Sequence, residues 1–224
     1  METCMARKKL ANICIDPGHG GTASGAVNSE LNIMEKDIAL AVSFKVSEYL
    51  LYATKSLVTG EAQINSSCQD NHNPLVNVFM TRGMDVDVSL QERCEIANKI
   101  PASCFVSIHC NSYSGTVASG IETFRYKGCS KASKTLAQSI HCCMMESVKG
   151  FEVTDEDGTK HSPISRGVKE NQTYYTLRHT SMPSVVVEIG FLSHNGEATL
   201  LNSEEYQDAV AKGIAYGILY AYAY

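Results

Sequence analysis

Short apolar runs alternate with longer amphipathic segments along this chain of 224 residues. Four to eight apolar residues bounded by turn-forming residues are typical of a strand that is buried in a sheet. Runs of this kind predict strands over residues 13–16, 76–81, 105–109, 120–126 and 185–189.

The longer segments predict helices. Residues 35–51 have apolar side chains at every third or fourth position, which is the period of a helix with one buried face. A second helix, over residues 89–98, is expected to begin with a capping box, because Ser89 and Glu92 have the required spacing. Two further helices are expected over residues 133–148 and 204–222.

Strands that alternate with helices of this length indicate an α/β fold. We expect a three-layer sandwich in which helices flank a mostly parallel, twisted sheet. Hydrophobic residues make up 44% of the chain, which suits one sizeable core. We therefore predict a single domain over residues 12–224 after a short lead-in over residues 1–11, with polar loops over residues 59–74 and 150–163.

Composition and charge narrow the classes of partner. The formal net charge is −5, so the chain has no broad basic character that predicts binding to nucleic acid or to an anionic membrane. No run approaches the roughly 20 apolar residues that cross a bilayer, and residues 1–10 lack the apolar stretch of a secretory signal.

The chain has nine cysteines, most of which lie inside apolar runs. An odd number of such cysteines suits a reducing compartment better than a disulfide framework. No C-x-x-C pair occurs, which disfavours a zinc site built from cysteine.

The first predicted strand ends in a glycine-rich turn around His19. Gly18 and Gly20 allow the backbone to turn tightly, and the imidazole is then directed outward from the end of the sheet. Taken alone, this pattern fits a tight turn with an exposed histidine equally well.

Three further residues favour a catalytic interpretation. A second strand-like run ends in His109, Glu35 opens the first long helix, and Glu188 lies within the last apolar run. A carboxylate among apolar neighbours is costly to bury unless it is paired, protonated or bound to a metal. Together with His19, these residues indicate a metal hydrolase.

Structural alternatives stay open for both glutamates. Glu35 lies in the first turn of its helix, where an anion is also favoured by the helix dipole. Glu188 is also compatible with a buried ion pair. Its candidate partners are Arg82, Arg166 and Arg178.

The order of these motifs resembles the zinc-dependent N-acetylmuramoyl-L-alanine amidases of the Amidase_3 type. The matching stretches extend over nearly the whole chain from Ile13 onward, and their order and spacing together carry the resemblance. They are residues 16–21, Glu35, 81–85, 90–93 with 97–98, 107–111, 120–122, 166–168 and 183–193.

The resemblance implies one catalytic zinc ion held by His19, Glu35 and His109, with Glu188 as the catalytic acid and base. Two histidines and one carboxylate leave a fourth zinc position for water. The implied reaction is hydrolysis of the amide between the lactyl group of N-acetylmuramic acid and L-alanine in peptidoglycan. A zinc peptidase that cuts within the peptides and a wall-binding module without activity are the alternatives.

Other polar residues near these motifs have less definite roles. Asp16 and Asn111 adjoin the ligands and are expected to orient the histidines. Glu30 is the expected substitute if Glu35 is not a ligand, and Glu122 is a further carboxylate without an assigned role.

Two residues depart from the family's pattern. Cys110 stands where a small residue is common. Because adjacent strand residues point to opposite faces, we do not expect Cys110 to form a nucleophilic pair with His109. His194 stands where asparagine is common, which leaves the conformation of the local loop open.

Location and regulation follow from the same reading. A wall substrate and a chain suited to a reducing compartment predict storage in the cytoplasm until release, as in a phage endolysin or an enzyme of mother-cell lysis. An exported protein whose leader has been removed is the alternative.

We expect a monomer. Some amidases of this family carry an inserted helix that covers the zinc, and residues 126–166 lack such a pattern, so we expect constitutive activity.

Overall fold

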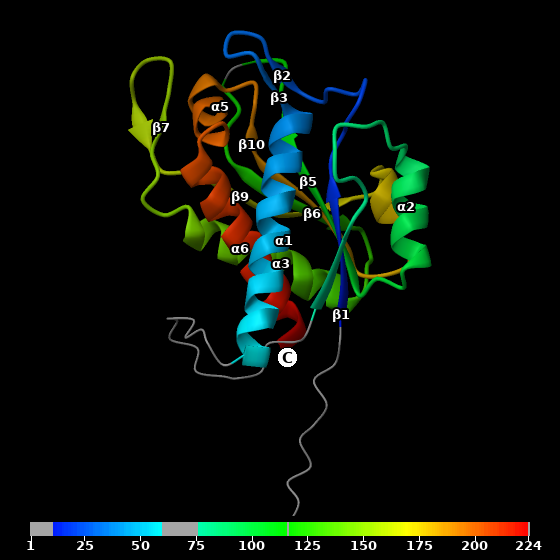
Figure 1. Ribbon diagram of the computed structural model, residues 1–224. Coiled ribbons are helices and arrows are strands. Elements are labelled where there is room, and N and C mark those ends of the chain that lie inside the picture. The colour runs from blue at the N-terminus through cyan, green and yellow to red at the C-terminus, as the bar shows by residue number, and fades with distance from the viewer. Residues whose placement is uncertain (1–10, 60–75, 116, 224) are drawn as a thin grey trace, which may run out of the picture.

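The computed structural model describes residues 11–59, 76–115 and 117–223 (Figure 1). Most of the expected lead-in and of the first expected loop lies outside these described residues. A six-stranded sheet has the order β4-β1-β5-β10-β6-β9. Its strands are β1 (Ala11–Pro17), β4 (Val76–Met80), β5 (Cys104–Asn111), β6 (Ile121–Tyr126), β9 (Ser165–Asn171) and β10 (Ser184–Phe191).

Four of these strands run parallel to one another. β1 pairs in parallel with β4 and β5, and β5 pairs in parallel with β10. β6 is antiparallel to β10, and β9 is parallel to β6. The predicted α/β class and mostly parallel sheet are therefore confirmed, with two reversed strands at one edge.

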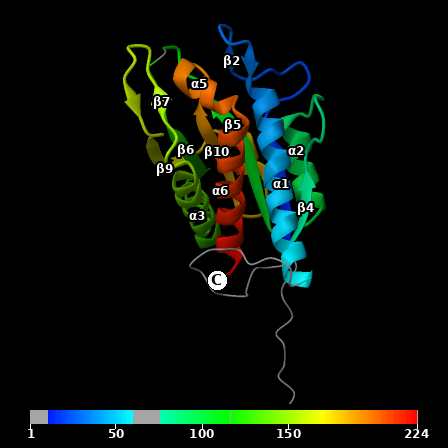
Figure 2. The same cartoon turned by 60° about the vertical axis from the view of Figure 1, so that its left-hand side comes forward.

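One face of the sheet is covered by the three long helices. These are α1 (Glu35–Thr59), α3 (Lys131–Ser147) and α6 (Glu204–Ala223), which form one layer in Figure 2. The apolar residues at every fourth position of α1, from Ile38 to Leu50, are buried in the main core, as their spacing predicts. The core between this layer and the sheet holds most of the buried apolar side chains of the described residues.

The opposite face is covered by two shorter helices, α2 (Leu90–Lys99) and α4 (Tyr175–His179). The predicted capping box of α2 is present: the Ser89 side chain accepts from the backbone of Glu92, and the Glu92 side chain accepts from the backbone of Ser89. α2 packs against a small second core that includes Cys14 and Phe105. The three predicted layers are therefore present, and the helical layer that contains α2 and α4 is thinner than the layer of three long helices.

Successive residues of β5 point to opposite faces of the sheet. Val106, Ile108 and Cys110 belong to the main core beneath the three long helices. Because successive strand residues point to opposite faces, Ser107 and His109 lie on the face that carries α2 and α4. These two polar side chains therefore lie on the thinly covered face of the sheet.

Several short elements differ from the sequence predictions. The segment expected as a polar loop over residues 150–163 contains a small hairpin, β7 (Val153–Thr154) with β8 (Lys160–His161). The helix α5 (Asn195–Leu201) was not predicted, because seven residues are too few to display a helical period. β2 (Val27–Asn28) and β3 (Ile33–Met34) form another short hairpin in the segment before α1.

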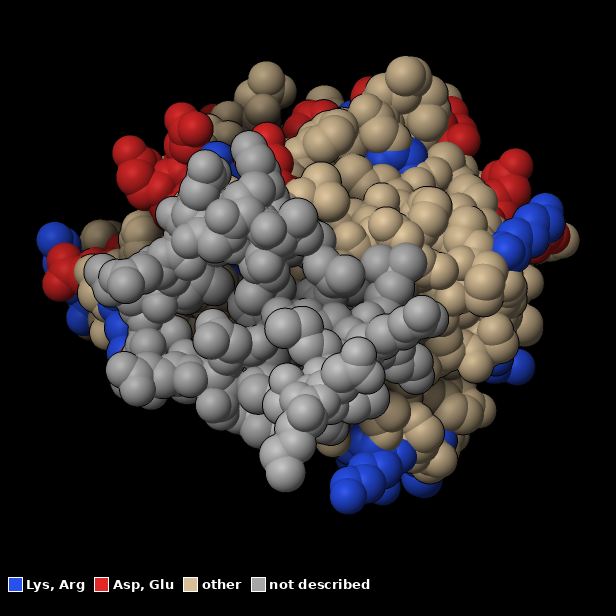
Figure 3. Space-filling model, turned by 60° about the horizontal axis from the view of Figure 1, so that its bottom comes forward, with Lys and Arg blue, Asp and Glu red and all other residues tan. Residues whose placement is uncertain are grey.

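None of the helices in the described part of the chain could span a membrane. On the face shown in Figure 3, acidic and basic side chains are scattered around the edge of the view.

Candidate active site

His19 lies in a turn that begins where β1 ends. Its φ angle is 57°, in the left-handed region that non-glycine residues seldom adopt. Two buried arginines hold the carbonyl oxygens of this turn. Arg93 Nη2 donates to the His19 oxygen at 2.6 Å, and Arg82 Nη2 donates to the Gly18 oxygen at 2.8 Å. The unusual backbone conformation of His19 is thus fixed by its surroundings.

Two glycines make room for the other site residues. A Cβ atom at Gly18 would lie 2.6 Å from His109 Nδ1. A Cβ atom at Gly25, whose φ is +70°, would collide with Glu35 Oε2 and lie 2.7 Å from His19 Cδ2. Real Cβ contacts are almost never this short, so only glycine fits at either position without a shift.

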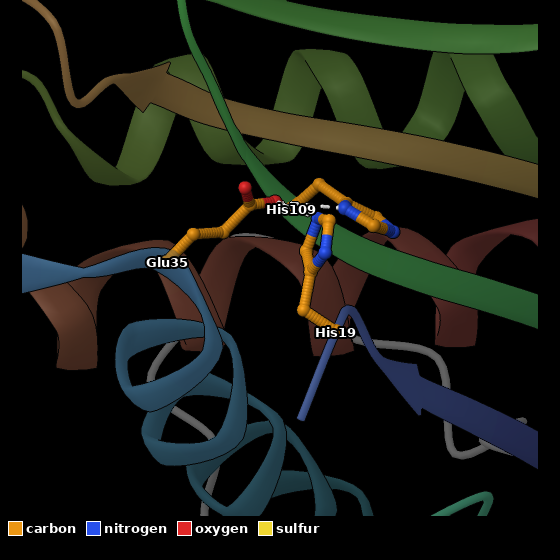
Figure 4. Close-up of side chains that lie close together, drawn as sticks. All are labelled: His19, Glu35 and His109. Carbon is orange, nitrogen blue, oxygen red and sulfur yellow. Dashed lines mark hydrogen bonds and ion pairs between the residues drawn. The ribbon is translucent and has the colours of Figure 1, made fainter. Parts of the chain in front are cut away.

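His19, Glu35 and His109 converge from three separate elements (Figure 4). His19 Nε2 lies 3.1 Å from Glu35 Oε1, and His109 Nδ1 lies 2.8 Å from the same oxygen. One ligand atom from each residue lies within 4.8 Å of the other two, a spacing that suits a shared metal ion. The structure therefore brings together the three residues that the resemblance implied as ligands.

The Glu35 carboxylate is buried, and its contacts are with groups outside its own helix. It accepts from the backbone N–H of Ala26 at 2.7 Å and of Cys110 at 3.0 Å. Burial opposes its ionisation, but hydrogen bonds with His109 and His19 outweigh burial and hold the pKa of Glu35 well below its ordinary value. Helix capping alone does not account for Glu35, because its carboxylate contacts the two histidines and two loop or strand amides.

Glu188 lies next to His109 on the adjacent strand, where the two residues are in register. Its side chain is buried, and its Oε2 atom has no hydrogen-bond partner among the described residues. Burial, opposed in part by the charge of His109, raises the pKa of Glu188 to about 7. A carboxyl with this pKa exchanges protons readily near neutral pH.

The proposed ion pair of Glu188 with an arginine is absent from the described contacts. Arg82 donates to backbone carbonyl groups, and Arg166 pairs with Glu122. Tyr174 instead lies close enough to Glu188 to affect its electrostatics, and burial raises the pKa of Tyr174 to about 12. The phenol of Tyr174 therefore stays protonated and is available as a donor.

Asp16 acts on His109 through Ser107. The Asp16 carboxylate accepts from Ser107 Oγ at 2.6 Å, from Thr81 Oγ1 at 2.5 Å and from Arg93 Nη1 at 2.7 Å. Ser107 Oγ in turn lies 3.1 Å from His109 Nε2. This chain of contacts fixes the orientation of the His109 ring, as expected for Asp16.

Asn111 differs from its expected role. Its described side-chain contacts are with Glu122 Oε1, at 3.5 Å, and with the backbone N–H of Ser112. Neither contact reaches a histidine, because Asn111 lies one pleat beyond His109 along β5.

The spare carboxylates lie outside the metal cluster. Glu30 accepts from Asn195 Nδ2 at 2.8 Å, on the surface. Glu122 is buried and pairs with both Arg166 and Lys169. Neither residue is placed to substitute for Glu35.

Cys110 and His194 have local structural roles. Burial raises the pKa of the Cys110 thiol well above its ordinary value, and the side chain belongs to the main core. His194 is the N-cap of α5: its Nδ1 accepts from the backbone of Glu197, and its Nε2 lies 3.0 Å from Asp155 Oδ1. The histidine thus caps a helix and joins it to the β7–β8 hairpin.

Sequence reasoning missed Gly25, Ser107 and Tyr174. Ser107 had a signal, since it lies two residues before His109 and shares its face of the strand. Gly25 and Tyr174 had none, because their contacts depend on how separate loops come together.

Known proteins are similar to this chain over most of its length. The family described as N-acetylmuramoyl-L-alanine amidase matches residues 13–220. The endolysin of Bacillus phage SPP1 is 34% identical over 208 residues, covering 92% of this chain and 64% of the endolysin. The germination-specific N-acetylmuramoyl-L-alanine amidase of Bacillus subtilis strain 168 is 30% identical over 221 residues, covering 92% of this chain and 78% of that protein. The crystal structure of an N-acetylmuramoyl-L-alanine amidase from Clostridium difficile 630 superposes with a TM-score of 0.74 at 30% identity, covering 94% of this chain and 95% of that one.

Proposed function

The chain belongs to the N-acetylmuramoyl-L-alanine amidase family, whose members hydrolyse peptidoglycan. We propose that it cleaves one amide bond of peptidoglycan with the help of a zinc ion held by His19, Glu35 and His109. The bond joins the lactyl group of N-acetylmuramic acid to L-alanine of the stem peptide. The supporting observation is the meeting of two imidazoles and one carboxylate beside a buried glutamate with an unpartnered oxygen.

The donor set fits zinc. Catalytic zinc sites use three protein ligands of the nitrogen and oxygen type and keep one position open. Glu35 is held in its anionic form, and the Ser107–Asp16 contacts orient His109, as the partners of metal-bound histidines usually do. Zinc bound there would polarise the substrate carbonyl and make water a better nucleophile.

Glu188 supplies the proton transfers. Its pKa of about 7 allows it to accept a proton from the attacking water and to pass that proton to the departing nitrogen of L-alanine. The Tyr174 hydroxyl is a nearby donor for the carboxyl, while Oε2 remains free to face the reacting groups.

Mass spectrometry of digested peptidoglycan tests the proposed reaction. We expect free stem peptides that begin with alanine, together with glycan strands that retain intact lactyl groups. Fragments cut within the stem peptide would instead indicate a peptidase. Metal analysis of the same protein preparation should give about one zinc ion per chain, and a different or absent metal would contradict the zinc assignment.

We further propose that the enzyme is a monomer held in the cytoplasm until the membrane is breached. The similarity to a phage endolysin and the abundance of buried free cysteines support this placement. Cells that express the chain should stay intact until the membrane is permeabilised, and should then lyse rapidly unless a zinc chelator is present. Lysis of intact cells without permeabilisation would contradict it. Light scattering coupled to size-exclusion chromatography tests the monomer.

A further inference from the structure

A buried carboxylate near the candidate zinc site is shared by two cations. Glu122, on β6, is 3% exposed. Arg166 Nε donates to one of its oxygens, and Lys169 Nζ lies 2.7 Å from the other. Both cations come from β9, and their side chains are 36% and 38% exposed. Each therefore reaches Glu122 while part of it remains open to solvent.

This cluster lies on the same face of the sheet as the catalytic residues. Glu122 and Glu188 are paired in register on neighbouring strands. The guanidinium carbon of Arg166 lies 5.1 Å from the centre of the Phe191 ring, and Phe191 pairs with Asn111 just beyond His109. Strands lie about 4.8 Å apart, so Glu122 on β6 is about 5 Å from β10 and the backbone of β9 is about 10 Å from it. The cationic groups, which reach from β9 to Glu122, lie between these limits.

The cluster carries more positive charge than Glu122 requires. One carboxylate neutralises one cation, and the pair Arg166 and Lys169 leaves one positive charge in excess. The other described side-chain hydrogen bond of Arg166 is from Nη1 to the Ser119 carbonyl at 3.3 Å. A guanidinium has five N–H donors in a fork that matches a carboxylate. Glu122 thus holds two cations in place, and their exposed sides can receive an anion.

The distance from the catalytic carboxylate suggests which anion. An extended peptide advances about 3.3–3.6 Å per residue, so a separation of about 5–10 Å corresponds to the second or third residue after the scissile bond. Resting on the proposed amidase function, we propose that Arg166 and Lys169 bind a free carboxylate on the second or third residue of the stem peptide. The cluster is then a specificity site that favours acidic stems over amidated ones.

Binding measured without turnover tests the subsite. The zinc-loaded Glu188→Gln protein is titrated with a muramoyl tripeptide whose carboxyl groups are free, and with the same compound amidated at the second or at the third residue. We expect one of the two amides to bind about tenfold more weakly or worse, because a charge-assisted hydrogen bond is lost. Adding Lys169→Gln should reduce that preference to near unity. Arg166 still neutralises Glu122 in this variant, so the fold should be retained, which circular dichroism checks.

Lys127→Gln is the matched control. It removes the same charge from an exposed residue just beyond the far end of β6, and it should leave the preference intact. The subsite would be overturned if Lys169→Gln and Lys127→Gln showed the same preference for a free carboxylate. It would also be overturned if the Glu188→Gln protein without either change showed no preference for a free carboxylate at either residue. If the protein with intact Glu188 cleaves neither kind of compound while the binding preference persists, the amidase proposal fails and the subsite stands.

Discussion

Replacing Gly25 by alanine should weaken zinc binding while leaving the fold intact. Gly25 has no side chain, and its contribution to the site is the room that it leaves for the ligands Glu35 and His19. An added Cβ would collide with Glu35 Oε2 and lie 2.7 Å from His19 Cδ2. Glu35 has no simple retreat, because the backbone N–H groups of Ala26 and Cys110 hold its two carboxylate oxygens.

The expected magnitude has two parts. Placing alanine at φ +70° costs about 1–2 kcal/mol of folding stability. Ordinary carbon contacts are about 3.5–4.0 Å, so the clash requires a shift of about 1 Å in one of the two ligands. Disturbing the support of a metal ligand typically lowers metal affinity by about 10–100-fold, or about 1.4–2.8 kcal/mol.

Gly128→Ala separates the two parts. Its φ is +74°, nearly that of Gly25, but nothing lies within 4 Å of the added Cβ. Gly128→Ala should therefore lose the same 1–2 kcal/mol in chemical denaturation, while keeping wild-type zinc affinity.

Zinc affinity is measured by competition with a chromogenic chelator, and stability by urea unfolding of the metal-free proteins. We expect the two variants to have similar midpoints and to differ by about 10-fold or more in zinc affinity. If Gly25→Ala binds zinc as tightly as Gly128→Ala does, the close packing of the ligands against Gly25 does not position them.

Four further predictions concern the catalytic residues and their control. His109→Ala should lose zinc and wall-lytic activity together, since a catalytic site needs three protein ligands, and full zinc occupancy by metal analysis would remove His109 from the ligand set. Glu188→Gln should keep zinc and fold but lose about 10²–10⁴-fold in turnover of purified cell walls, and wild-type rates would end its catalytic role. Tyr174→Phe should lower kcat without changing zinc content, because only a hydroxyl donor near Glu188 is removed, and an unchanged kcat would show that this donor is dispensable. The purified protein should clear cell-wall suspensions without an added activator, and an inert preparation that a partner protein activates would contradict this expectation.

The short elements show where sequence reasoning was weakest. The long helices and buried strands were predictable because their period extends over many residues, as in α1 and β10. The β7–β8 hairpin and α5 were not, because strands of two residues and a helix of seven residues leave no period to detect. His194 illustrates the consequence: its role as an N-cap depends on an element that the pattern did not reveal.

The sequence by itself determined the class of fold and the identity of the candidate ligands. Apolar periodicity is a local property, and His19, Glu35, His109 and Glu188 stand at the ends or within strong periodic elements. Their chemistry follows from residue type, so the resemblance to zinc amidases is visible in the sequence alone.

Only the tertiary structure decided how these residues act together. The contacts of Asp16 with Ser107, of Gly25 with Glu35, and of Glu122 with its two cations join elements that are distant in the chain. Burial of Glu188 and the resulting rise in its pKa likewise depend on what packs around β10. Such properties are set by the three-dimensional distribution of charge and solvent, which a one-dimensional pattern does not contain.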